Sequence, residues 1–167
     1  MRKIELTLST GTWTVCAVPA YLLEDVLSAV PLPEIPERPA ENTPPGVTLT
    51  VPDPDNPEYV AARDKALAER ARLYERAQLY YAFREVDVPN DWPGPAQVRE
   101  WEALGLNVQI SSDPVDHKVA YIKRAVFGCD ADRALFDVAM TVLNEPTEEE
   151  RASVRGLFRR SLQGQGD

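Results

Sequence analysis

Two short runs near the start of the chain alternate between apolar and polar residues, and the sequence STGT lies between them. A period of two is typical of half-buried strands, and a short polar stretch with glycine favours a turn. The pattern therefore predicts a β-hairpin over residues 3 to 18. Its apolar positions are Ile4, Leu6 and Leu8, then Trp13, Val15 and Ala17.

The spacing of apolar residues changes after Pro19, which suits the first turn of a helix. We expect a short helix over about residues 20 to 29 that shares a core with the hairpin, so that residues 1 to 30 form one unit. Its apolar residues fit one helical face. They are Leu22, Leu23, Val26, Leu27 and Val30.

A proline-rich strap follows over residues 31 to 56. Nine of the 15 prolines fall between Pro31 and Pro57. Proline lacks a backbone donor, so this segment cannot sustain a helix or a central strand. The exception is VTLTV at residues 47 to 51, whose alternating β-branched residues predict a third strand at the edge of the hairpin.

A long charged helix is predicted directly after the strap. Asn56, Pro57 and Glu58 fit an N-cap, a first helical position and an acidic first turn. About 27 residues at about 1.5 Å each would form a rod of roughly 40 Å. Its apolar face is broad and therefore needs a partner. The apolar positions include Tyr59, Ala62, Ala66, Leu67, Leu73, Tyr74, Ala77, Tyr80 and Tyr81.

Shorter helices are predicted in the rest of the chain. One spans Ala96 to Leu104 and ends at Gly105, and the next opens at Asp113 and runs to Gly128. Another extends from a cap at Asp130 to Asn144, with Leu135, Val138, Met140, Val142 and Leu143 as apolar residues. The capping-box pair Thr147 and Glu150 opens a last helix, whose apolar side holds Val154, Leu157, Phe158 and Leu162.

These elements predict a mainly helical α+β protein with a long central helix and a cluster of short helices. Residues 57 to 163 would pack with the N-terminal unit as one domain, and residues 164 to 167 would form a flexible tail. Trp92, in the sequence VDVPNDWPGP, is the expected hydrophobic anchor of the connection after the long helix.

The charge favours protein partners. The chain has 167 residues, 18 basic and 27 acidic, with a formal net charge of −9. Nucleic acid and anionic lipid should therefore be repelled overall. Polar residues interrupt the apolar runs near the N-terminus, so we expect no signal peptide and no membrane span. The expected location is cytosolic, with Cys16 and Cys129 reduced and buried.

Candidate catalytic groups are sparse. His117 lies at a predicted helix start, and no nucleophile elbow accompanies it, so a solvated surface histidine is the simpler interpretation. The acidic groups Asp113/Asp116, Asp130/Asp132 and Glu148/Glu149/Glu150 also fall at helix starts, where capping explains them. We therefore predict no catalytic residue, no metal site and no cofactor.

The predicted partner-binding residues lie on the long helix: Leu67, Tyr74, Tyr80 and Tyr81. Aromatic residues are enriched at the energetic centres of interfaces. Arg151, Arg155, Arg159 and Arg160 form a basic ridge on the last predicted helix. This ridge is interpreted as a solvated face, with docking on an acidic partner or RNA as the alternative.

The order of these features resembles that of small proteins encoded among the tail genes of long-tailed bacteriophages and prophages, in particular tail assembly chaperone-like proteins. The resemblance rests on the hairpin, the strap ending in DPDNPEYVAA, the charged helix, VDVPNDW, DHKVAYIKRAVFG and EPTEEE. It covers most of the chain.

The resemblance implies a non-enzymatic helical protein in the host cytoplasm. Its implied partner is an elongated tail component such as the tape measure protein. The broad apolar face of the long helix leaves a second copy of the chain as another possible partner. The alternative is a minor structural component of the virion tail, and a small enzyme is a third, weaker alternative. Members of such families can also be made in longer, frameshifted forms.

Overall fold

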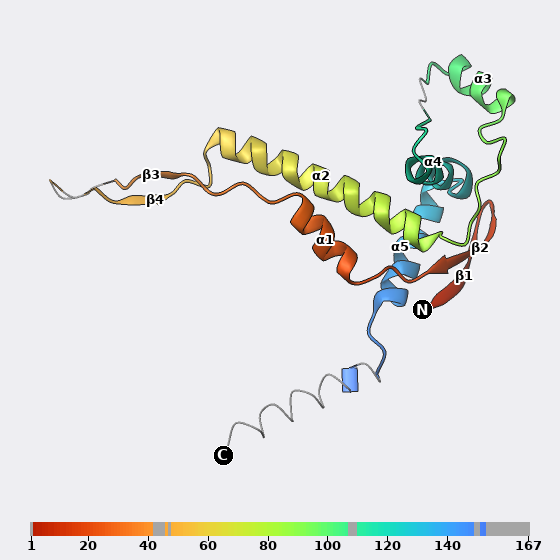
Figure 1. Ribbon diagram of the computed structural model, residues 1–167, viewed down its shortest axis with the longest axis horizontal. Coiled ribbons are helices and arrows are strands. Elements are labelled where there is room, and N and C mark those ends of the chain that lie inside the picture. Colours follow the sequence, from red (N-terminus) through yellow and green to blue (C-terminus); the bar gives the residue numbers. More distant parts are fainter. Residues whose placement is uncertain (1, 42–45, 47, 107–109, 149–150, 153–167) are drawn as a thin grey trace.

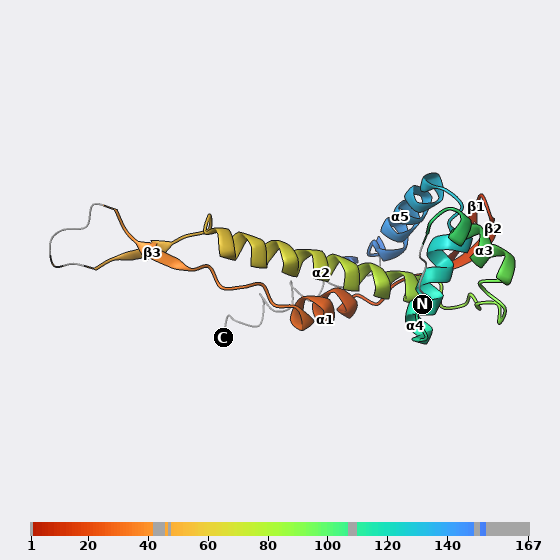
Figure 2. The ribbon, with the colours of Figure 1, turned by 90° about the horizontal axis from the view of Figure 1, so that it is seen from above.

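The computed structural model describes residues 2–41, 46, 48–106, 110–148 and 151–152. It confirms the mainly helical α+β class with an N-terminal hairpin, a long central helix and short helices after it (Figure 1). A body at one end holds the hairpin and the C-terminal helices. The long helix extends away from this body, and the strap lies at its far end (Figure 2).

The predicted hairpin forms from strands β1 (Lys3–Leu8) and β2 (Gly11–Cys16). The two strands are antiparallel, with Ile4 opposite Val15 and Leu8 opposite Gly11. Gly11 has a φ of 145°, a backbone conformation that residues with a side chain rarely adopt. Leu8 and Val15 are buried, so the alternation in the sequence directs one face of the hairpin into the core.

The hydrophobic core gathers residues from the hairpin and three later elements. These are α2 (Pro57–Ala82), the helix α4 (Pro114–Tyr121) with its continuation η1 (Ile122–Val126), and α5 (Asp130–Asn144). Phe136 of α5 stacks on Phe83, with ring centroids 5.3 Å apart, and both side chains are fully buried. The other fully buried large side chains are Leu79, Ile122, Val15, Val126 and Cys16.

A buried carboxylate joins the hairpin turn to the start of α5. Asp132 is 2% exposed and accepts hydrogen bonds from Ser9 N at 2.8 Å, Ser9 Oγ at 2.5 Å and Gly128 N at 2.8 Å. A side chain at Gly128 would collide with the Ser9 hydroxyl. Asp132 therefore makes a tertiary contact, whereas the sequence pattern had indicated only helix capping.

These hydrogen bonds give Asp132 a role in stability against acid. The Ser9 hydroxyl, with the amides of Ser9 and Gly128, holds the pKa of Asp132 below its ordinary value. The lowered pKa stabilises the folded state above the unfolded pKa of about 3.9, and this contribution is lost as the pH falls through the folded-state pKa.

We expect Asp132→Asn to lower the free energy of unfolding at pH 7. When the pH is then lowered from 7 to about 3, the free energy of unfolding should fall less in the variant than in the wild type. Urea unfolding at both pH values measures this difference. Asp130→Asn is the matched control, because it removes a charge from the same helical turn without touching the bonds to Ser9 and Gly128. An unchanged acid dependence in Asp132→Asn would show that the carboxylate does not act as described.

The long helix α2 begins as predicted. The Asn56 side chain accepts hydrogen bonds from the amides of Glu58 and Tyr59 at 3.0 and 3.2 Å, and Pro57 is the first helical residue. The helix is 26 residues long. Only Leu79 and Ala82 are buried within it, and both lie near its C-terminal end. The N-terminal part of α2 therefore extends beyond the core.

The predicted third strand of the hairpin is wrong. A strand does form, β4 (Thr50–Pro52), but it pairs antiparallel with β3 (Glu37–Pro39) inside the strap. Hydrogen bonds from Ala40 N to Leu49 O and from Asp53 N to Pro36 O extend this ribbon. The two sheets are separate, and Val47 lies outside the described residues. The strap thus supplies both strands of its own ribbon, at the end of α2 far from the hairpin (Figure 1).

The shorter helices follow the predicted order with local differences. The helix α3 (Pro95–Ala103) is followed by Gly105 with φ 73°, as a C-terminal glycine requires. The helix predicted from Asp113 to Gly128 instead becomes a π-helix at η1, where Phe127 N bonds to Ile122 O. Cys129, not Asp130, is the N-cap position of α5.

Trp92 anchors the connection after α2, as predicted. Its ring contacts those of Trp101, His117 and Tyr121, with centroid separations of 6.2, 5.4 and 5.2 Å. His117 stacks on Trp92, and its Nε2 lies 3.1 Å from the Trp92 carbonyl oxygen. His117 is therefore half-buried, and the prediction of a solvated surface histidine is wrong.

Candidate protein-docking surface

The short helix α1 (Tyr21–Ala29) lies along α2 (Figure 1). Leu22 and Val26, four residues apart, are its buried side chains. The Arg70 guanidinium of α2 donates to the carbonyl oxygens of Val30 at 2.7 Å and Leu27 at 3.3 Å. These bonds satisfy carbonyl groups at the end of α1 that have no partner within the helix. Arg70 therefore fixes the position of α1 along the long helix.

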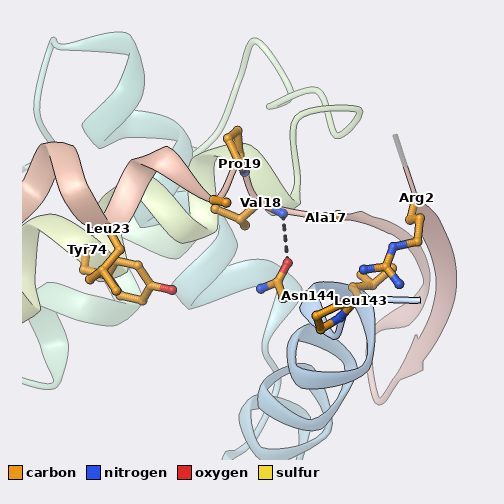
Figure 3. Close-up of a pocket in the computed structure, with 10 residues that line it drawn as sticks. Arg2, Ala17, Val18, Pro19, Leu23, Tyr74, Leu143 and Asn144 are labelled. Atoms are coloured by element: carbon orange, nitrogen blue, oxygen red, sulfur yellow. Dashed lines mark hydrogen bonds between the residues drawn. The ribbon is translucent and has the colours of Figure 1, made fainter. Parts of the chain in front are cut away.

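The other apolar side chains of α1 remain exposed. Leu23 and Leu27 are 48% and 41% exposed, and they lie one helical turn apart. On α2, Leu67 is 45% exposed, and half-buried Tyr74 follows it two turns later on the same side. Leu23 and Tyr74 line one groove (Figure 3). We call Leu23, Leu27, Leu67 and Tyr74 the α1–α2 strip.

The groove continues the α1–α2 strip toward the C-terminal end of α5. Its volume is about 830 Å³. Residues 17 to 20 form one wall, Leu23 and Tyr74 another, and Leu143, Asn144 and Pro146 the third (Figure 3). Asn144 Oδ1 accepts a hydrogen bond from Val18 N at 3.3 Å, which joins α5 to the segment after the hairpin. The Arg2 guanidinium donates to the carbonyl oxygen of Glu145.

The groove has the chemistry of a binding surface for apolar side chains. Of the ten residues that line it, only Arg2 and Tyr74 have ionisable side chains. The remaining lining is mostly aliphatic, and the amide oxygen of Asn144 already accepts a backbone hydrogen bond. Such a surface fits a ridge of apolar residues on a helix, which commonly binds in a hydrophobic groove.

The four predicted partner-binding residues divide into two groups. Leu67 and Tyr74 belong to the α1–α2 strip. Tyr80 packs against the core cluster, and the Lys118 ammonium lies 5.6 Å from its ring centroid. Tyr81 is half-buried beside it, with the two rings edge to face at 5.8 Å. The structure therefore places Tyr74 in the groove beside Leu23 of α1 and Tyr80 against the core, and it leaves Leu67 exposed two turns before Tyr74.

The contribution of α1 to this exposed apolar surface was not predicted from the sequence. All its apolar residues had been assigned to one inward face. Leu22 and Val26 are turned about 100° from Leu23 and Leu27 around the helix axis, however, so a single neighbouring helix covers only one pair. The width of this apolar arc was the signal that could have revealed an exposed strip.

A second exposed apolar stripe lies on α5. Leu135, Val138 and Val142 are 48%, 63% and 58% exposed, whereas Met140 and Leu143 are buried. All five residues had been predicted to supply apolar surface to this helix. The structure uses only part of that surface for the core.

The remaining candidate groups have structural contacts. Asp113 caps α4 by accepting hydrogen bonds from the amides of Val115 and Asp116 at 2.9 and 3.0 Å. The Asp116 amide, with that of Val115, lowers the pKa of Asp113. Asp116 itself pairs with Arg76 of α2.

Cys16 is buried as predicted, but Cys129 is exposed, so that part of the cysteine prediction is wrong.

Within the described residues, no three His, Cys, Asp or Glu side chains gather as a metal site would require. No helix in the same part of the chain is long and apolar enough to cross a membrane. Glu149 and Glu150 and most of the predicted last helix, including Arg155, Arg159 and Arg160, lie outside the described residues. Arg151 pairs with Glu148 at 3.0 Å.

Comparison with protein-family models, curated proteins and solved structures finds no match for this chain.

Proposed function

We propose that this protein is a non-enzymatic adaptor that binds a helical segment of another protein on the α1–α2 strip and in the adjoining groove. The observation that carries the proposal is that Leu23 of α1 and Tyr74 of α2 line one groove together. The exposed Leu27 lies one turn after Leu23, and the exposed Leu67 lies two turns before Tyr74. A partner helix could therefore contact the rod and the body together.

The charge around this surface selects the partner's chemistry. Exposed Glu24, Asp25 and Glu145 lie near groove residues in the chain. Two basic residues are also here, because Arg2 lines the groove and Arg70 binds the end of α1. The chain as a whole carries −9. We therefore propose a partner helix with apolar residues three and four positions apart and basic residues beside them.

The biological setting of the proposal is tail assembly in long-tailed bacteriophages. It rests on the sequence resemblance described above and on a shape in which a rigid rod presents an apolar strip. The proposed partner is the tape measure protein, and the protein acts in the host cytoplasm before the tail is complete. The proposed action is binding through protein contacts, without a metal or cofactor.

Co-expression with the tape measure protein of the same tail gene cluster tests this proposal. We expect the two chains to elute as one complex in size-exclusion chromatography, and the purified tail to lack this protein. Absence of a complex would contradict the adaptor function. Stoichiometric copies in purified particles would instead show that the protein is a structural component of the virion.

A further inference from the structure

Among the described residues that line the groove, only Arg2 carries a charge. Two hydrogen bonds fix its position. Ala17 N, just after β2, donates to the Arg2 carbonyl oxygen at 2.9 Å, and the Arg2 guanidinium donates to the carbonyl oxygen of Glu145 at the end of α5. Figure 3 shows the Arg2 side chain at one end of the groove, with Leu23 and Tyr74 at the other.

The Arg2 guanidinium keeps donors that its own chain does not use. A guanidinium has five N–H donors in a planar fork that matches a carboxylate. Within the described part of the chain, its acceptor is the backbone carbonyl of Glu145, and no carboxylate pairs with it. Lys3, the next residue, is by contrast paired with Glu85 at 3.3 Å. The groove wall therefore presents a positive charge that a carboxylate from outside the chain can bind.

The charges around the groove differ between its two ends. Exposed Glu24 and Asp25 follow Leu23 on α1, at the end away from Arg2. They attract basic residues and repel a carboxylate, as does the net charge of −9. Arg70, at the end of α1, already donates to two carbonyl oxygens. Complementary charges fix which end of a partner meets which end of a surface.

We propose that Arg2 binds a carboxylate of the partner helix, at the end of that helix that enters the groove beside α5. The basic residues of the partner then lie over α1. Hydrogen bonds between a guanidinium and a carboxylate are stronger than those between neutral groups, and a partner without the carboxylate would cover the Arg2 charge and leave it unpaired. Arg2 is therefore a specificity-determining residue, an inference that rests on the proposed function.

Isothermal titration of the full chain with the tape measure protein of the same tail gene cluster tests this role. Arg2→Gln removes the charge but keeps a donor for the Glu145 carbonyl. We expect it to bind on the order of fivefold more weakly, as the loss of a partly exposed ion pair predicts. Arg2→Lys keeps the charge and should bind within about twofold of the wild type. The loss in Arg2→Gln should shrink as salt is added, because salt screens the pair.

Arg99→Gln is the matched control, because it removes the same charge from the exposed surface of α3, outside the groove. It should bind as the wild type does. An equal loss in Arg99→Gln would assign the effect to net charge, and an equal loss in Arg2→Lys and Arg2→Gln would assign it to a structural role. Either result would overturn the proposal, as would unchanged or tighter binding by Arg2→Gln.

A measurement from the partner's side is independent of any effect of Arg2 on folding. Each acidic residue in the bound segment of the tape measure protein is changed to its amide. One of these changes should weaken binding to the wild type by the same factor and have no further effect on Arg2→Gln. Equal effects of every change on both chains would refute the pairing. Absence of any complex with the wild type would instead contradict the adaptor function itself, so the two failures are distinguishable.

Discussion

Phe136→Ala is expected to lower the free energy of unfolding by about 3–5 kcal/mol, the usual effect of removing a buried aromatic side chain and leaving a cavity. Phe136 is fully buried, stacks on Phe83 and lies with its ring centroid 5.4 Å from that of Phe127. Domains of this kind have about 5–15 kcal/mol of stability in total, so the variant should be close to unfolding. Urea denaturation gives the difference.

The neighbouring residue supplies a matched control. Leu135 lies on the same helix but is 48% exposed, so Leu135→Ala should change stability by only about 0.5 kcal/mol. A comparable loss in both variants would contradict the described core and would show that the exposed stripe of α5 is covered in solution.

Leu23→Ala combined with Tyr74→Ala is expected to weaken binding of the partner helix by at least thirtyfold while the body still unfolds cooperatively. Truncation of one energetically central interface residue commonly costs about 2 kcal/mol, which corresponds to that factor. Both side chains line the groove and lie outside the fully buried core. Isothermal titration with the tape measure protein measures the affinity.

Val138→Ala, on the exposed stripe of α5, is the control and should bind normally. Equal affinity of the double variant and its parent would remove the α1–α2 strip from the interface. Loss of cooperative unfolding would instead assign Tyr74 to the core.

Features with local causes could be predicted from the sequence. The Asn56 cap, the glycine after α3 and the alternation of the hairpin each depend on residues close together in the chain. Pairing between distant segments could not be predicted. The strand at Thr50–Pro52 looked like an edge for the hairpin, because its partner at Glu37–Pro39 lies in a proline-rich segment with little strand character.

The same contrast between local contacts and contacts across distant parts of the chain applies to individual side chains. Asp132 resembles a capping residue because it lies in the first turn of a helix, but its contact with Ser9 crosses 123 positions of the chain. His117 looked solvated until the structure placed it against Trp92. For the candidate site, the apolar face of the long helix predicts a surface that includes Leu67 and Tyr74, and Leu67 is 45% exposed. The exposed side of α1 depends on which of two adjoining faces packs on α2, and the sequence leaves that choice open.

The most direct test of the adaptor account is hydrogen exchange measured on the chain alone and in complex with the tape measure protein. The account predicts slower exchange in the complex over residues 21–29 and 67–75, with no change in the β1–β2 hairpin. A complex in which exchange slows only in α3, or only along the exposed stripe of α5, would contradict it.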